Sequence, residues 1–160
     1  MPGERSRVGL GMAVALHAAM NAELPIAATP ANPHFERFGG HEAVVRLVDA
    51  FYRAMDTRED ARIIRAMHED DLARTRAVLV KYLSEWMGGA KLYSADHGAP
   101  MLRRRHHRFD IDAAARDAWM ACMRQALAET CLDIALRRDL DAAFWKIADH
   151  IRNTDSPRSP

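Results

Sequence analysis

A pair of adjacent histidines, His106 and His107, lies in the basic run RRRHHR at residues 103–108. A neutral imidazole binds metal ions through one ring nitrogen, and guanidinium groups bind carboxylates and other anions. Successive residues of a helix are rotated by about 100°, so only one of the two histidines can face a given target. The residue types alone leave two interpretations open: a metal ligand beside an anion, or structural and exposed histidines on a solvated basic face.

Other kinds of site are disfavoured by the motifs and spacings of the chain. It has no glycine-rich phosphate loop, Cys-x-x-Cys pair, His-Glu-x-x-His motif or nucleophile elbow. A zinc site built from His97, His106 and His107 would lack the usual paired spacing of zinc ligands. The basic run has no aromatic interleaving beyond Phe109. Charge is otherwise balanced, with 23 Lys and Arg against 22 Asp and Glu, so we expect no nucleic-acid partner.

The length and composition indicate a soluble protein with one main domain. The chain has 160 residues, of which 49% are hydrophobic, which is enough for a substantial core. Its N-terminal apolar run is far too short to span a bilayer, and we expect no membrane partner. Cys122 and Cys131 would lie about 13 Å apart along one helix, too far for a disulfide. Such reduced thiols favour a cytoplasmic location.

Three regions of the chain differ in composition. Residues 1–34 contain two arginines, a short apolar run and then several prolines. This pattern favours a flexible N-terminal extension, or a start at Met12 or Met20, over a signal peptide, because glycines and a histidine interrupt the apolar run. We expect the folded domain to occupy residues 35–153 and a polar, proline-containing tail at residues 154–160 to be disordered.

Apolar residues recur at three- and four-residue spacing and predict an all-α domain. A first long helix is expected from His41, after a turn at the preceding glycine pair. Its apolar stripe comprises Val44, Val48, Phe51, Tyr52 and Met55. A shorter polar segment follows at residues 57–66, with Ile63 and Ile64 as its apolar contribution, and a corner follows at residues 67–71. No segment alternates with period two.

The next helix is expected over residues 72–86, ending at a glycine pair that provides a C-terminal cap. We interpret residues 90–98 as a loop. Pro100 suits the first turn of a short helix that reaches His106.

Two further helices complete the predicted domain. Asp110 or Asp112 can cap the helix that carries Trp119. The last helix has the clearest amphipathic pattern, because its apolar residues share one face. These residues are Leu140, Phe144, Ile147, Ala148 and Ile151.

Residues of several unrelated types occur at characteristic positions along the chain. They include Phe51, Tyr52 and the corner MHEDDL at residues 67–72. The remaining matching positions are Gly88, Gly89, Tyr93, Ser94, Gly98, Pro100, Leu102, Arg103, Arg104, Arg105, His106, Phe109, Ile111, Arg116, Asp117, Ala118, Trp119, Cys122 and Met123. On these residues the chain closely resembles the group II truncated haemoglobins of bacteria, over roughly residues 35–153. The resemblance implies a shortened globin fold, a two-over-two helical sandwich around one haem b.

The resemblance assigns the basic run to the cofactor. His106 matches the proximal histidine, whose neutral imidazole binds the haem iron, whereas His107 lies outside the motif and is expected to face solvent. Arg105 and Tyr93 match positions that meet the haem propionates, and a guanidinium is a charge-assisted partner for a carboxylate. The cofactor-binding residues expected in this way are His106, Arg105, Tyr93, Leu102, Phe109, Leu79 and Tyr82.

Other positions match the distal side, where a gas would bind. Tyr52 matches the distal tyrosine and Trp119 the family's pocket tryptophan, and each has one polar hydrogen to donate. A bond from such a donor to a charged acceptor contributes about 1–3 kcal/mol. His68 takes a corner position where the family carries Phe, Tyr or His, and would be a third, pH-sensitive donor. A shift of the corner by one residue would place Met67 there instead. Thr75 stands where many oxygen-storing globins have a distal histidine.

These roles imply a haem protein that binds oxygen reversibly on ferrous iron, together with other diatomic gases such as nitric oxide and carbon monoxide. The alternative is a redox enzyme that uses the same pocket to turn nitric oxide and oxygen into nitrate, or to reduce peroxide. A third hypothesis is a helical interaction module without haem, in which His106 has no special role. A reductase would serve either haem function as a partner, and the protein would be a monomer or a homodimer.

Overall fold

All regular structure in residues 34–155, the part of the chain that the computed structural model describes, is helical, as predicted. The elements are α2 (Phe35–Phe38), α3 (Gly40–Thr57), the 3-10 turn η1 (Glu59–Ala61), α4 (Arg62–Ala66), α5 (Ala73–Trp86), α6 (Leu92–His97), α7 (Leu102–His106), α8 (Ala113–Thr130) and α9 (Ile134–Ile151). None of them is long and apolar enough to cross a membrane. The expectations for residues 1–33 and 156–160 lie outside the described residues.

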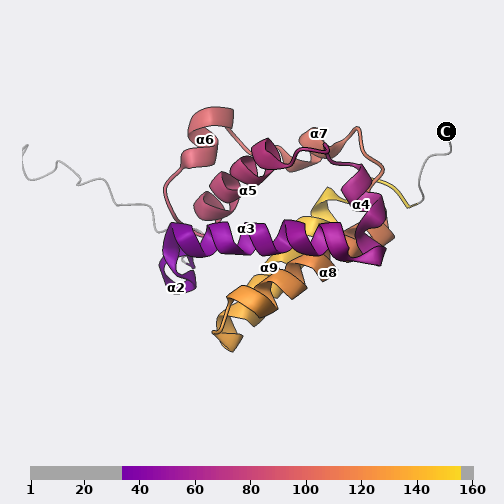
Figure 1. Ribbon diagram of the computed structural model, residues 1–160. Helices are drawn as coiled ribbons and strands as arrows, with labels where there is room; N and C mark the ends of the chain where they lie inside the picture. Colours follow the sequence, from indigo (N-terminus) through magenta and orange to yellow (C-terminus); the bar gives the residue numbers. More distant parts are fainter. Residues whose placement is uncertain (1–33, 156–160) are drawn as a thin grey trace, which may run out of the picture.

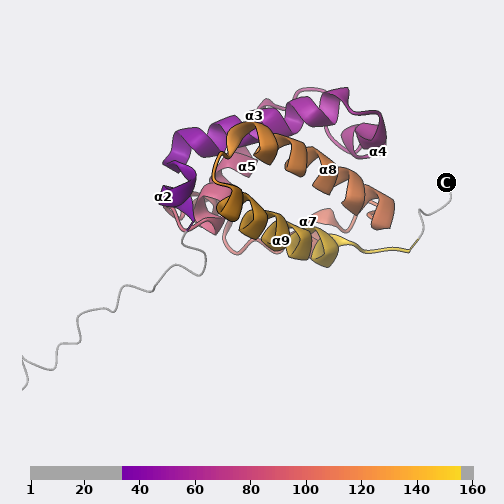
Figure 2. The same ribbon diagram turned by 90° about the horizontal axis from the view of Figure 1, so that it is seen from below.

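Two pairs of long helices form the two layers of the fold. α3 packs against α5 in one layer, and α8 lies beside α9 in the other, as Figure 1 and Figure 2 show from two directions. A turn at residues 131–133 joins α8 to α9, so these helices are antiparallel. α3 also packs along α8 and connects the layers. The arrangement is the expected two-over-two sandwich, with α6 and α7 along the α5 side in Figure 1.

α3 supplies the centre of the core because its apolar residues return every three or four positions to one face. Every residue of the predicted stripe is buried: Val44, Val48, Phe51, Tyr52 and Met55. The cysteines are buried free thiols, with Cys131 one residue beyond the end of α8. Burial raises the pKa of Cys122 to about 11, so this thiol stays neutral at physiological pH.

α5 ends at the glycine pair that was predicted to cap it. Gly88 has φ of 99°, a left-handed conformation that favours glycine, and its N–H donates to the carbonyl of Glu85 at 3.0 Å. The N–H of Gly89 donates to the carbonyl of Ser84 at 2.8 Å. A Cβ at Gly89 would lie 2.8 Å from that same oxygen. The backbone N–H groups of the two glycines therefore satisfy two carbonyls at the end of the helix, and a side chain would disturb this arrangement.

The interpretation of residues 90–98 as a loop is wrong, because residues 92–97 form α6. The helix is held by a contact with α5. The backbone N–H of Ser94 donates to the Glu85 carboxylate at 2.8 Å, and the Ser94 hydroxyl donates to the same carboxylate. These bonds hold the pKa of Glu85 below its usual value. A six-residue helix fixed by a tertiary contact has too few residues for a periodic pattern.

Two smaller expectations also differ from the structure. Ile64 is buried, but Ile63 is 68% exposed, because neighbouring residues of a helix point in directions about 100° apart. The short helix that reaches His106 begins at Leu102, so Pro100 precedes it and does not occupy its first turn.

Aspartate caps fix the starts of α8 and α9. Of the two predicted candidates for α8, Asp112 is the cap, and its carboxylate accepts the N–H of Ala115 at 2.8 Å. Asp133 caps α9 by accepting the N–H of Leu136 at 3.0 Å. It also binds Arg37 at 2.9 Å, and these two contacts hold the pKa of Asp133 below its usual value.

Candidate functional site

A cavity of about 400 Å³ is enclosed by residues of both helical layers and of the short helices beside them. All the site residues expected from the resemblance line this single cavity: Tyr52, His68, Leu79, Tyr82, Tyr93, Leu102, Arg105, His106, Phe109 and Trp119. Most of the remaining wall is apolar and comes from Phe51, Ile64, Val78, Leu83, Ile111, Ala115, Phe144, Ile147, Ala148 and Ile151. The fold thus brings distant parts of the chain to one largely apolar space with a few polar groups.

The ring of His106 is held in one tautomer by its own helix. Its Nδ1 lies 2.7 Å from the carbonyl oxygen of Leu102, one turn earlier. A carbonyl can only accept, so Nδ1 carries the proton, and Nε2 of the neutral ring keeps its lone pair. A hydrogen bond from the other ring nitrogen to a carbonyl is typical of metal-binding histidines, because it fixes the ring and leaves Nε2 available.

His107 is separated from the cavity, in agreement with the rotation between neighbouring helical residues. Its side chain is exposed and its Nδ1 bonds to the carbonyl of Arg104 at 2.6 Å. It does not contribute to the cavity wall. Of the two histidines, only His106 can act on a molecule held in the cavity.

The segment after His106 is anchored to the end of α9 by Asn153. The Asn153 amide nitrogen Nδ2 donates to the carbonyls of Phe109 at 2.8 Å and His106 at 3.3 Å. Its Oδ1 accepts the N–H of Ile111 at 3.0 Å, and its own N–H donates to the carbonyl of Ile111 at 2.9 Å. Sequence reasoning did not single out Asn153, because partners more than forty positions away leave no local pattern.

Arg105 lines the cavity and is hydrogen-bonded to residues that precede α7. Its Nε donates to the carbonyl of Pro100 at 2.9 Å and its Nη2 to the carbonyl of His97 at 3.1 Å. Its guanidinium lies 5.7 Å from the centre of the buried Tyr93 ring. The remaining N–H groups of Arg105 have no partner among residues 34–155 and can bind an anion at the cavity.

Two buried or partly buried aromatic residues bring polar hydrogens to the wall formed by α3 and α8. Tyr52 is 3% exposed. The centre of the Trp119 ring lies 5.3 Å from the centre of the Phe51 ring. Neither the Tyr52 hydroxyl nor the Trp119 indole N–H donates to another group in the described part of the chain. Burial raises the pKa of the Tyr52 phenol, so it keeps its proton. Both groups are therefore available to a molecule in the cavity.

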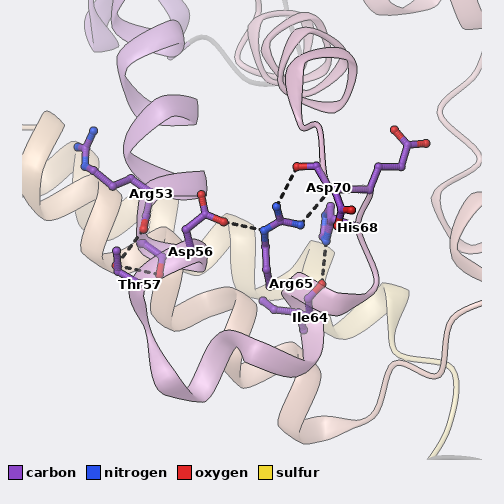
Figure 3. Close-up of polar contacts among 9 residues, drawn as sticks. Arg53, Asp56, Thr57, Ile64, Arg65, His68 and Asp70 are labelled. Carbon is purple, nitrogen blue, oxygen red and sulfur yellow. Dashed lines mark hydrogen bonds and ion pairs between the residues drawn. The ribbon is translucent and has the colours of Figure 1, made fainter.

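The corner that carries His68 is fixed by Arg65, as the dashed lines in Figure 3 show. The Nε of Arg65 donates to the carboxylate of Asp56 on α3 at 2.6 Å. Its two terminal nitrogens donate to the carbonyls of Glu69 and Asp70 at 3.0 and 3.1 Å. Arg65 thus ties the corner to α3, and this is a positioning role that the sequence did not reveal.

His68 differs from the expected donor in one respect. Its Nδ1 lies 2.7 Å from the carbonyl of Ile64, so Nδ1 carries the proton and Nε2 of the neutral ring is an acceptor. Burial lowers the pKa of His68, which keeps the ring neutral at physiological pH. A donating Nε2–H exists only after protonation at acid pH. Met67 and Thr75 also line the cavity, so the corner brings both alternatives, His68 and Met67, to the same space.

Residues 33–153 match the family model described as bacterial-like globin. The chain belongs to this family. Among solved structures it is similar to a cold-adapted truncated haemoglobin from the Antarctic marine bacterium Pseudoalteromonas haloplanktis TAC125, with 39% identity, a TM-score of 0.74, and coverage of 77% of this chain and 98% of that one. A group II 2-on-2 haemoglobin from the plant pathogen Agrobacterium tumefaciens is 37% identical with a TM-score of 0.73, covering 79% and 98%.

A truncated oxygen-avid haemoglobin from Bacillus subtilis is 32% identical, with a TM-score of 0.70 and coverage of 76% of this chain and 100% of that one. These likenesses confirm the recognition of the chain as a group II truncated haemoglobin and the two-over-two globin fold. A globin of this family is a haem protein.

The residues of the cavity fit a haem. An imidazole with a fixed tautomer, His106, offers a lone pair to an iron. The wall is otherwise dominated by apolar and aromatic side chains, which suit the macrocycle. Arg74, Arg105 and Arg108 also line the cavity, and guanidinium groups are suitable partners for the carboxylates of a haem.

Proposed function

We propose that this globin binds one haem b, with His106 as the proximal iron ligand, and binds oxygen and other diatomic gases reversibly. The observation that supports it most directly is the tautomer of His106, whose Nδ1 is bonded to the Leu102 carbonyl at 2.7 Å inside the cavity wall. Ferrous iron in a bound haem supplies the position at which a gas binds. The relative from Bacillus subtilis, described as oxygen-avid, also supports this function.

The chain's own residues have separate roles in this proposal. Leu102 and Asn153 fix the orientation of His106 by bonds to its ring and its backbone. Arg105, assisted by Tyr93, would bind the haem propionates, and the apolar wall would keep water away from the iron. Tyr52 and Trp119 would donate hydrogen bonds to a gas held in the cavity, and these bonds would retain oxygen more strongly than carbon monoxide, which is a weaker acceptor.

The histidine assignment is tested by comparing His106→Gly with His107→Gly. We expect His106→Gly to bind haem weakly, without the absorption of an imidazole-ligated iron, and free imidazole to restore that absorption by entering the space left by the side chain. His107→Gly should take up haem like the unchanged protein, because His107 is exposed and outside the cavity. Haem titration followed by absorption measures both. Equal losses in the two variants would contradict the assignment of His106, and no haem uptake by the unchanged protein would contradict the proposed function.

A further inference from the structure

His68 and His106 both line the cavity, and their rings are held by the same kind of internal hydrogen bond. The Nδ1 of His68 donates to the carbonyl of Ile64, and the Nδ1 of His106 donates to the carbonyl of Leu102, at 2.7 Å in both cases. Each bond fixes the ring and leaves the Nε2 of a neutral imidazole with its lone pair. The arrangement that suits His106 to bind a metal ion is therefore repeated at His68.

The two histidines reach the cavity from different parts of the fold. α4, which precedes His68, packs against α3 and α8, and the His68 ring lies edge-on to Tyr52 of α3 with 5.9 Å between the ring centres. α7, which carries His106, packs against α9, where Asn153 anchors the segment that follows it. A haem iron has two axial positions, one on each face of the planar macrocycle. Histidines from different walls can therefore serve opposite faces.

The His68 ring is poorly suited to donate to a bound gas but well suited to bind iron. Its only N–H already points to the Ile64 carbonyl, and bound oxygen needs a donor. Burial is the main cause that lowers the pKa of His68, and the positive charges of Arg65 and His106 lower it further. The ring is thus neutral, which is the form that binds metal ions. The influence of His106 indicates that the two rings lie near enough for their charges to interact.

We infer that His68 is a second axial ligand of the haem iron, bound through Nε2 in the ferric protein while no gas or anion occupies that position. The inference rests on the proposed function, because it needs a haem whose iron is held by His106. The His68 lone pair forms a bond to the iron, and an incoming ligand breaks that bond, with no transfer of electrons or protons. An external ligand must displace His68, so His68 lowers the apparent affinity for such ligands.

The spin state of the ferric haem-loaded protein tests this inference, measured by absorption and electron paramagnetic resonance. Iron with two imidazole ligands is low-spin, whereas iron with one imidazole and a water molecule is high-spin. We expect the unchanged protein to be low-spin and His68→Phe to be high-spin. Phenylalanine keeps an aromatic ring beside Tyr52 but has no lone pair. High-spin iron in the unchanged protein, or low-spin iron in His68→Phe, would overturn the inference.

His107→Phe is the matched control, because His107 also bonds through Nδ1 to a carbonyl of its own helix but is exposed and outside the cavity. This variant should remain low-spin, and a change to high-spin like that of His68→Phe would overturn the inference. Met67→Leu and Tyr52→Phe test the thioether and the phenol that also line the cavity. A low-spin spectrum that persists in His68→Phe and disappears in one of these variants would assign the ligand to that side chain instead.

Azide titration of the ferric protein gives a second measurement of the same bond. If His68 holds the iron in about nine-tenths of the molecules, His68→Phe should bind azide about tenfold more tightly, whereas His107→Phe should bind it like the unchanged protein. Equal azide affinity in all three proteins would overturn the inference. Haem titration is done first, because failure of the unchanged protein to take up haem would overturn the proposed function itself.

Discussion

The polar groups of the cavity differ in which of their atoms are already hydrogen-bonded within the protein. In both His68 and His106, Nδ1 donates to the carbonyl four residues earlier, at 2.7 Å in each case. Both rings therefore present an unprotonated Nε2 when neutral. The Tyr52 hydroxyl and the Trp119 indole N–H are donors with no partner among residues 34–155. The same cavity thus contains lone pairs on imidazole nitrogens and free polar hydrogens on aromatic residues.

At the residue scale, we predict that Tyr52→Phe and Trp119→Phe each speed oxygen dissociation from the ferrous protein. Each change removes one donor, and a lost bond of about 1–3 kcal/mol corresponds to roughly a five- to 150-fold increase in rate. Laser photolysis or stopped-flow mixing measures the rates.

Carbon monoxide is the control for these two variants, because it is a weaker hydrogen-bond acceptor when bound. Its dissociation should change much less than that of oxygen. Similar acceleration of both gases would indicate a general opening of the pocket, and unchanged oxygen rates in both variants would exclude the donor role.

The short helices depend on tertiary contacts, since α6 and α7 have six and five residues and isolated helices of this length are unstable. α6 is held by Glu85, and the segment after α7 is held by Asn153. The corner at residues 67–71 is tied to α3 by Arg65. The segments that carry His68 and His106 are thus each held by a single polar side chain: Arg65 of the short helix α4, which reaches Asp56 on α3, and Asn153 just beyond the end of α9.

At the element scale, we predict that Asn153→Ala speeds haem loss from the loaded protein. It removes the side-chain bonds to His106, Phe109 and Ile111, and leaves their backbone groups less satisfied, at a cost of about 1–3 kcal/mol. Haem transfer to an excess of apomyoglobin, followed by absorption, measures the rate.

Asp133→Ala is the matched control for this prediction. It removes the cap at the other end of α9 and the partner of Arg37, so it should lower the free energy of unfolding without reaching α7. Equal acceleration of haem loss by the two variants would mean that overall stability, and not the anchor of α7, governs retention.

The whole molecule places its cavity inside the same packing that forms its core. α3 lies at the centre, with buried residues on one face and Phe51 and Tyr52 in the cavity wall. The apolar stripe of α9 likewise contributes to both the core and the cavity wall, because Phe144 is buried and also lines the cavity. A ligand held there contacts residues from both layers of the sandwich, so binding and folding are thermodynamically linked.

At the scale of the molecule, we predict that adding haem raises the Tm of the protein, because a ligand that binds the folded chain better than the unfolded chain stabilises it. At a free ligand concentration of a hundred times Kd the gain is about 2.7 kcal/mol. Thermal unfolding followed by circular dichroism measures it. His106→Gly should show a smaller rise, and an unchanged Tm in the native sequence would argue against haem in this cavity.

The sequence determined the helical class and most of the long helices, because periodic apolar residues such as Val44, Val48 and Phe51 report directly which face is buried. Neighbouring residues also predict where helices begin and end, as the glycine pair after α5 and the two aspartate candidates for α8 illustrate. The residues around the cavity were named only through the resemblance to truncated haemoglobins. The residue types of the basic run alone left its histidines open to a structural interpretation.

Only the tertiary structure determined α6, the anchoring by Asn153 and the state of the His68 ring. Each depends on a partner that no local pattern identifies: Glu85 for α6, the carbonyls around His106 for Asn153, and the Ile64 carbonyl for His68. Helical periodicity is a property of neighbouring residues, whereas a hydrogen bond across the fold or a cavity wall depends on where distant segments meet. For this reason an apolar stripe such as that of α9 predicts burial but cannot by itself distinguish core packing from the wall of a ligand cavity.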